Sequence, residues 1–326
     1  MMKYIKYLKI PTPAAILFVL LFFGTSFYSG IAYTKSKTGD VLGAKSVFTV
    51  DKTEKPNFDF YVMSFCPYGN QIEDVIKPVA ELLGDKADIR PRYIFEKIEG
   101  GLSNYCGPNR VGDPNFCSNY VSSGYFTDID SCKKAIEENK KTCADESNYI
   151  KASESVYYSS LHGRVEANQN VREICAYNIA QDKNMWWNFV DNVNKNCNQQ
   201  DADTCWEDQA KAVGYDTNEI TKCFNEQGIS LIEKEIEKTT ANNVTGSPTL
   251  FVNNAKFPPE EAYIQDGSGT LKIGKTVVNQ NDFRSANTLK EAVCAAFKKA
   301  PKECKTTLSS EAASGGTAAS AASSCN

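Results

Sequence analysis

The feature that most restricts the fold of this chain is a cysteine placed between a short apolar run and an amphipathic helix. Residues 58–65 are rich in aromatic and aliphatic side chains, which is typical of a buried strand. The run leads into the motif Cys-Pro-Tyr-Gly at 66–69, and apolar residues then recur at helical spacings of three and four. These residues are Ile72, Val75, Ile76, Val79, Leu82 and Leu83. A second apolar run at 89–95 follows Gly84, so the chain is predicted to open as strand, helix, strand.

Cys66 occupies a position where a helix favours a thiolate. The first helical turn offers unpaired backbone N–H groups and the positive end of the helix dipole. Both stabilise a negative sulfur, so the thiol pKa falls and the nucleophile is present near neutral pH. Pro67 suits this first turn, where its missing N–H costs nothing. We predict that Cys66 is a catalytic thiol, and the alternative is an ordinary buried or disulfide-bonded cysteine.

A second element, Gly-Ser-Pro-Thr at 246–249, precedes another apolar run far along the chain. Together with the Cys-Pro motif it resembles the thioredoxin superfamily, in which a strand opens with a cis-proline beside the active-site cysteine. The resemblance implies that Pro248 is cis and that the backbone of Ser247 binds an extended substrate. Pro67 and Tyr68 would then line the rim of the substrate site. The alternative for Pro248 is an ordinary trans turn proline.

The long, largely helical stretch between these two motifs resembles the inserted helical domain of DsbA-type disulfide oxidoreductases. The predicted fold class is therefore α/β: a thioredoxin-like fold with a large disulfide-stapled, mainly helical insertion. Residues 100–143 are expected to be loop-rich, and residues 146–240 to be helical.

One short run within the insertion resembles the gamma-interferon-inducible lysosomal thiol reductase family. It comprises Leu161-His162-Gly163, then Glu166, Asn170 and Cys175, with the spacing of that family's signature. Two signature cysteines are absent, and Ala167 replaces one of them. His162 is expected to hold the insertion by a hydrogen bond at a helix junction, with a role as general base for Cys66 as the alternative.

The predicted mechanism depends on Gly69. Thioredoxin-like dithiol enzymes carry Cys-x-x-Cys, whose second thiol resolves the mixed disulfide, and here Gly69 takes the second position. We predict an extracytoplasmic monothiol thiol–disulfide oxidoreductase or isomerase that acts on disulfide- or thiol-containing polypeptides. Its resolving thiol would come from the substrate, from an external thiol or membrane redox partner, or from another cysteine of the chain. Replacing Gly69 with Cys is expected to confer dithiol activity.

Two other interpretations remain open. The chain is either a redox-silent thioredoxin-fold module that binds extended polypeptides in the same groove, or Cys66 is locked in a permanent disulfide. No metal, nucleotide or other cofactor is implied. Acidic and basic residues nearly balance, with a formal net charge of −4, and no dense Lys/Arg block occurs. Nucleic acid is therefore an unexpected partner, because phosphate binding needs concentrated positive charge.

The twelve cysteines lack the paired C-x-x-C spacing of a zinc site and indicate a disulfide framework formed in an oxidising compartment. All except Cys66 and Cys325 are expected to pair. Cys325 is either an incidental terminal cysteine or a tethered resolving thiol. The expected pairs are Cys106–Cys117, Cys132–Cys143, Cys175–Cys223, Cys197–Cys205 and Cys294–Cys304. Spacing alone leaves this connectivity open.

The N-terminal region predicts a membrane anchor. An uncharged stretch at 10–34 has an apolar centre long enough to span a bilayer, and lysines precede it. We predict a cytoplasmic N-terminus at 1–13 and a transmembrane signal anchor at 14–33, with the folded part outside the cytoplasm. The alternatives are a signal peptide cleaved near residues 30–32 and a buried core helix.

The remaining boundaries follow from composition and motif positions. They are a linker at 34–56, a thioredoxin-like domain at 57–99 and 244–304, an insertion at 100–243 and a disordered tail at 305–326.

Overall fold

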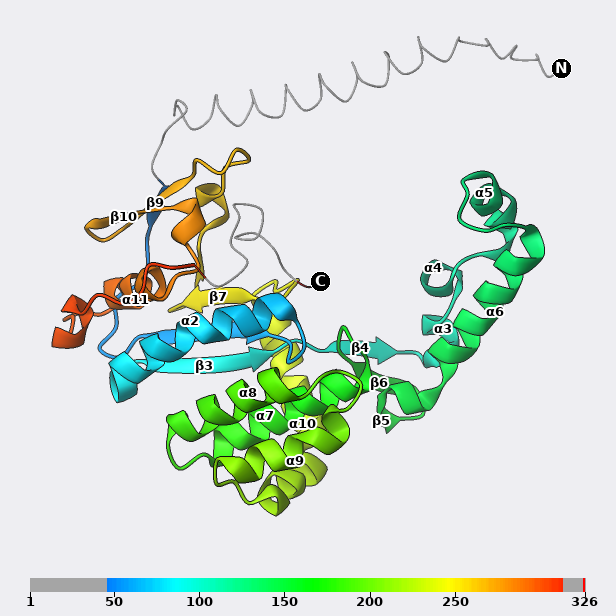
Figure 1. Ribbon diagram of the computed structural model, residues 1–326, viewed down its shortest axis with the longest axis horizontal. Coiled ribbons are helices and arrows are strands. Elements are labelled where there is room, and N and C mark those ends of the chain that lie inside the picture. The colour runs from blue at the N-terminus through cyan, green and yellow to red at the C-terminus, as the bar shows by residue number, and fades with distance from the viewer. Residues whose placement is uncertain (1–45, 313–324, 326) are drawn as a thin grey trace, which may run out of the picture. The chain divides into compact units, whose positions relative to one another are not determined.

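The computed structural model describes residues 46–312 and residue 325, and a four-stranded sheet lies at its centre (Figure 1). The strand order is β3-β2-β7-β8. The strands are β2 (Asn57–Val62), β3 (Asp88–Tyr93), β7 (Thr249–Val252) and β8 (Ala255–Phe257). β2 pairs in parallel with β3 and antiparallel with β7, and β7 pairs antiparallel with β8. Segments on either side of the long insertion therefore share one sheet.

Helix α2 (Pro67–Leu83) connects β2 to β3, as the apolar spacing predicts. Its buried face consists of fully buried aliphatic residues. These are Ile72, Ile76, Val79 and Leu83. The helix packs against α11 (Ala286–Ala295) and α8 (Lys183–Asn196). It ends at Gly84, whose φ of +50° is a conformation that glycine adopts without a steric penalty.

The inserted helices form a block along β3, an edge strand of the sheet (Figure 1). Besides α8 they are α7 (Arg164–Ile179), α9 (Ala202–Ala212) and α10 (Thr217–Ala241). Glu235 of α10 accepts a hydrogen bond from the backbone N of Tyr93 at 3.1 Å. Tyr177 of α7 donates one to the carbonyl oxygen of Ile89, also at 3.1 Å. The insertion thereby satisfies backbone groups that an edge strand leaves unpaired. The predicted thioredoxin-like fold with a helical insertion is confirmed.

The start of the insertion holds more regular structure than its composition suggests. This region contains a three-stranded sheet with the strand order β4-β6-β5. The strands are β4 (Glu96–Glu99), β5 (Ile150–Ser153) and β6 (Val156–Ser159). The helices there are α3 (Leu102–Tyr105), α4 (Pro108–Val111), α5 (Cys117–Ser122) and α6 (Ile129–Ala144). The predictions of a loop-rich 100–143 and a helical 146–240 are therefore wrong at α6 and at the β5–β6 hairpin. In α6 only Cys132 and Ile136 are buried, so its sequence carries little apolar periodicity.

The predicted linker and tail both contribute residues to the folded domain. Within the linker, β1 (Ser46–Phe48) pairs in parallel with β9 (Thr270–Ile273), which pairs antiparallel with β10 (Thr276–Asn279). A three-residue strand is too short to show an alternating pattern. In the predicted tail, Ser309 accepts a hydrogen bond from the backbone N of Asn287 at 2.9 Å. The single-turn 3₁₀ helices are η1 (Gly84–Lys86), η2 (Pro114–Phe116), η3 (Glu146–Asn148), η4 (Glu260–Ala262), η5 (Gln280–Asp282) and η6 (Lys302–Lys305).

Disulfides staple the insertion and the end of α11. The predicted pairs Cys175–Cys223, Cys197–Cys205 and Cys294–Cys304 are confirmed. The other two predicted pairs are wrong, because Cys106 bonds to Cys143 and Cys117 bonds to Cys132. Helix α6 packs back along α3, α4 and α5, so its first turn meets Cys117 and its last turn reaches Cys106. The Cys117–Cys132 disulfide therefore lies within the loop that Cys106–Cys143 closes, whereas the spacing suggests two disulfides that follow each other along the chain.

No helix in the part of the chain that the structure describes is long and apolar enough to cross a membrane. The predicted cytoplasmic segment 1–13, the signal anchor at 14–33 and the linker up to residue 45 lie outside the described residues.

Candidate active site

Cys66 caps the N-terminus of α2 and is fully buried. The backbone N of Gly69 donates a hydrogen bond to its Sγ at 3.4 Å. The backbone N of Cys66 donates to the carbonyl oxygen of Met63 at 3.0 Å, which fixes the tight turn between β2 and α2. The sulfur thus lies at the positive end of a 17-residue helix, where the sequence predicts it. A thiolate at this position would keep the Gly69 hydrogen bond.

The second part of the site is the loop that precedes β7. The Ser247–Pro248 peptide bond is cis, as the resemblance implies, and both residues are buried. The Oγ of Ser247 accepts a hydrogen bond from the backbone N of Met63 at 3.2 Å. The carbonyl oxygen of Ser247 lies 3.4 Å from the Sγ of Cys66. The two motifs that are predicted to form one site therefore lie side by side.

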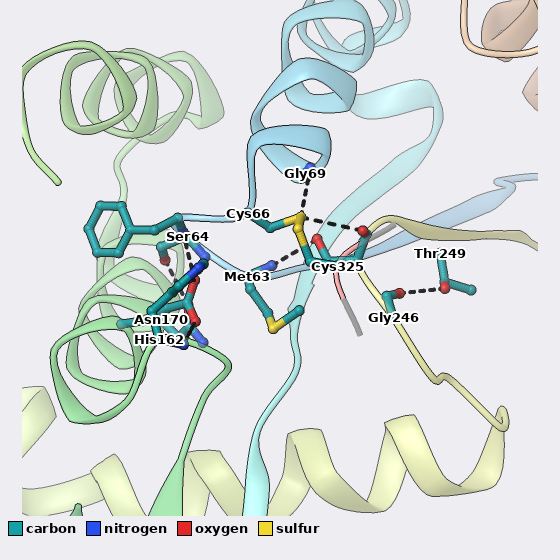
Figure 2. Close-up of a disulfide and its surroundings, with 12 residues drawn as sticks. Met63, Ser64, Cys66, Gly69, His162, Asn170, Gly246, Thr249 and Cys325 are labelled. Atoms are coloured by element: carbon teal, nitrogen blue, oxygen red, sulfur yellow. Dashed lines mark hydrogen bonds and ion pairs between the residues drawn. A yellow bond between two sulfur atoms is a disulfide. The ribbon is translucent and has the colours of Figure 1, made fainter. Parts of the chain in front are cut away.

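Cys325 lies against both motifs and bonds to Cys66 (Figure 2). It forms an antiparallel bridge with Ser247: the N of Ser247 donates to the oxygen of Cys325 at 2.8 Å, and the N of Cys325 donates to the oxygen of Ser247 at 2.7 Å. The prediction that Cys66 and Cys325 are free is therefore wrong. The backbone edge at Ser247 has one N–H and one C=O, and Cys325 of this chain's own tail satisfies both.

The remaining predicted site residues, Pro67 and Tyr68, form the first turn of α2. Pro67 is exposed and Tyr68 is half-buried. Gly69 faces inward, and a Cβ at this position would lie 2.7 Å from the Oγ of Ser247. The expected gain of dithiol activity on replacing Gly69 with Cys would therefore require Ser247 to move. The second sulfur of this site comes from the tail instead.

A buried polar network on α7 holds the residues immediately before Cys66. Glu166 is fully buried, and its carboxylate accepts hydrogen bonds from the backbone N of Phe65 at 2.9 Å and of His162 at 2.9 Å. The Nδ1 of His162 lies 3.0 Å from the same carboxylate. Asn170 accepts hydrogen bonds from the backbone N and the Oγ of Ser64 at 3.0 and 2.7 Å.

This network explains the short thiol-reductase-like run in physical terms. His162 precedes α7 and hydrogen-bonds to Glu166, which is the holding role that the sequence favours over general-base catalysis. Ser64, His162 and Asn170 lie together beside the loop that leads to Cys66 (Figure 2). Glu166 and Asn170 were not predicted as site residues. Their i, i+4 spacing shows that they share a helical face, but it does not reveal their partners, about 100 residues earlier in the chain.

Glu73 of α2 and Glu173 of α7 are both buried carboxyl groups. Burial and the nearby charge of Glu173 raise the pKa of Glu73 well above its usual range, although Asn194 donates a hydrogen bond to Glu73 at 2.8 Å. Burial also raises the pKa of Glu173 to about 7, despite hydrogen bonds from Tyr93 at 2.7 Å and Gln169 at 2.9 Å. The pair therefore carries less than its full charge near neutral pH.

We expect the free energy of unfolding to fall as the pH rises from about 4.5 to about 7. In this window the native chain binds more protons than the unfolded chain, because Glu173 keeps its proton only when folded. Glu173 alone should account for about 3 kcal/mol of the loss, which Glu173→Gln should remove, and Glu73, whose pKa is also raised, should add to the total. Guanidinium unfolding at pH 5, 6, 7 and 8 measures this, with the exposed Glu260→Gln variant as the control. A stability that is constant or rises across this window would contradict the expectation.

The family model of the vacuolar sorting receptor thioredoxin-like domain matches residues 76–260, a range that contains Ser247 and Pro248 but neither Cys66 nor Cys325. The chain is similar to vacuolar-sorting receptor 4 of Arabidopsis thaliana and vacuolar-sorting receptor 1 of Pisum sativum, each 25% identical over 146 residues. That alignment covers 40% of this chain and 22% of each relative, so the chain spans about a fifth of their length.

Similar solved structures include oxidised PaDsbA1 in complex with a triazole compound and reduced DsbG from Mycobacterium tuberculosis. The first is 13% identical with a TM-score of 0.35, covering 66% of this chain and 77% of that chain. The second is 13% identical with a TM-score of 0.37, covering 80% and 88%.

Proposed function

This chain belongs to the vacuolar sorting receptor thioredoxin-like domain family, and from that premise we propose that it exchanges disulfides with polypeptides through Cys66. The observation that carries the proposal is the Cys66–Cys325 disulfide, which lies at a helix N-terminus and on the backbone edge of Ser247. Cys325 supplies the second thiol that Gly69 does not. The chain then acts as a dithiol exchanger whose two sulfurs are far apart in sequence and adjacent in space.

The atoms and electrons of the exchange balance with only the chain and its substrate as reactants. In the reduced chain, the thiolate of Cys66 attacks a substrate disulfide, a Cys66–substrate bond forms, and one substrate thiolate leaves. The thiolate of Cys325 then attacks the Sγ of Cys66, which forms the Cys66–Cys325 bond and releases the second substrate thiol. Two thiols of the chain are oxidised and one substrate disulfide is reduced. The reverse reaction oxidises a substrate dithiol and opens the Cys66–Cys325 bond.

We also propose that the reaction takes place outside the cytoplasm, on secreted or surface polypeptides, with residues 14–33 as the membrane anchor. The disulfides of the insertion and of α11 support this, because such bonds persist in oxidising compartments. An external thiol or a membrane redox partner would restore the starting state of the Cys66–Cys325 pair after each exchange.

A redox-silent polypeptide-binding module is the second candidate. The relatives named as sorting receptors favour it, and the β-bridge between Ser247 and Cys325 supports it, because the backbone of Ser247 pairs there with another backbone. In that case a polypeptide would bind at Ser247 without forming a bond to Cys66, and Cys66→Ser would leave binding unchanged.

Insulin, a polypeptide with accessible disulfides, distinguishes the two candidates. After selective reduction of the Cys66–Cys325 bond and removal of the reductant, the full chain should reduce insulin disulfides up to one per chain and regain that bond. Cys325→Ser should stop at a Cys66–insulin mixed disulfide, and Cys66→Ser should do neither. Mass spectrometry of acid-quenched, unreduced digests identifies each species. Insulin that stays intact with all three chains would refute the exchange reaction.

A further inference from the structure

A pocket of about 250 Å³ opens beside the junction of Cys66 and Ser247. Its apolar lining comes from three separate segments: the loop before α2, the end of β3 and the turn before α7. The apolar lining residues are Met63, Ile94, Phe95 and Leu161. Leu161 is 45% exposed, so it presents apolar surface beside the pocket.

The Cys325 bridge sets the direction in which an extended segment crosses the site. Pairing at Ser247 is antiparallel, so residues that precede the bonded cysteine run toward Pro248. Residues that follow the bonded cysteine run toward Gly246 and Thr245. Thr245 lines the pocket, and so does Met63, whose backbone N holds the Ser247 side chain. A polypeptide bound as Cys325 is bound would therefore enter the pocket with the residues after its cysteine.

The polar lining of the pocket does not select for charge. Arg110 on α4 donates hydrogen bonds to Glu96 at 3.4 Å, and Tyr105 donates one to the same carboxylate at 2.8 Å. Because Arg110 and Glu96 neutralise each other, a charged side chain of a substrate would lose its hydration in the pocket without gaining a partner of opposite charge. An aliphatic side chain, in contrast, gains by covering the exposed part of Leu161 and of the half-buried Ile94.

We propose that this pocket binds an apolar side chain one or two positions after the reactive cysteine of a polypeptide substrate. The inference rests on the proposed exchange reaction and adds to it the direction and the side-chain class of the substrate. It assigns a role to the disulfide-stapled insertion, because Arg110 lies between Cys106 and Cys117 and forms part of the pocket.

The test uses the full chain carrying Cys325→Ser and two peptides of identical composition. Each peptide contains one cysteine as a mixed disulfide with nitrothiobenzoate, and a pair of leucines stands directly after or directly before that cysteine. Attack by Cys66 on the peptide sulfur forms a Cys66–peptide disulfide and releases coloured nitrothiobenzoate. The peptide with leucines after the cysteine should react roughly tenfold faster, the effect of burying one apolar side chain in part.

Leu161→Asp in the same background should abolish most of this preference and leave the reaction with the small disulfide of Ellman's reagent unchanged. Ile229→Asp is the matched control, since Ile229 is 38% exposed on α10 and does not line the pocket. Equal rates for the two peptides, or a preference for leucines before the cysteine, would overturn the inference even if Leu161→Asp failed to fold. A Cys66 that reacts with neither peptides nor Ellman's reagent would refute the exchange reaction itself.

Discussion

Replacing Cys325 with Ser should convert Cys66 from a sulfur that iodoacetamide does not alkylate into a free thiol that it alkylates readily, while the other ten cysteines stay paired. In the native protein Cys66 is bonded to Cys325 and fully buried. The substitution leaves Cys66 as a thiol at the N-terminus of α2, with the N–H of Gly69 directed at it. The expected change is from no labelling to stoichiometric labelling at neutral pH, measured by mass spectrometry of the alkylated, unreduced chain.

The pH dependence of that alkylation tests the cause of the reactivity. A free cysteine with a pKa near 8.5 is only about 3% thiolate at pH 7, so a pKa near 7 would raise the thiolate fraction to about 50%, roughly 16-fold. Cys66→Ser is the matched control, because it frees Cys325, a β-bridge residue that should titrate like an ordinary cysteine. If Cys66 in the Cys325→Ser chain titrated at or above the pKa of Cys325 in the control, the helix would not be activating it.

Features with local signals could be predicted from the sequence. The β2–α2–β3 unit follows from two apolar runs and one amphipathic helix, because adjacent residues determine that geometry. The cis Ser247–Pro248 bond is what the resemblance to the thioredoxin superfamily implies, and the same resemblance joins the two halves of the site. The same local information places Cys66 at a helix N-terminus before any contact is known.

Features that depend on distant contacts could not be predicted in this way. Cys325 lies 259 residues after Cys66, in a segment of small residues that has no periodicity. The nested disulfides depend on the direction in which α6 packs, which spacing does not encode. The partners of Glu166 likewise become visible only when α7 and the loop before Cys66 are brought together. Side-chain spacing shows which residues share a helix face, but the contacts of that face depend on tertiary packing.

The largest expected loss of stability from a single substitution near the site is that of Glu166→Ala. Glu166 is fully buried, and its removal leaves the backbone N–H groups of Phe65 and His162 without their acceptor. Each buried, unpaired N–H costs roughly 1–3 kcal/mol, so the free energy of unfolding should fall by about 4 kcal/mol. Guanidinium unfolding of the oxidised full chain measures this. Glu260→Ala, which removes an exposed ion pair to Lys256, is the control and should change stability by less than about 0.5 kcal/mol.

The same substitution tests whether α7 positions the sulfur or only stabilises the fold. Glu166 fixes Phe65, the residue immediately before Cys66, so its loss should let the cysteine move away from the N–H of Gly69. In the Cys325→Ser background, Glu166→Ala should therefore slow the alkylation of Cys66 at pH 7 and move its titration toward that of free cysteine. Glu166→Gln keeps one acceptor oxygen and should recover part of both effects. Reduced stability with an unchanged titration of Cys66 would show that the α7 network supports the fold and leaves the thiol unaffected.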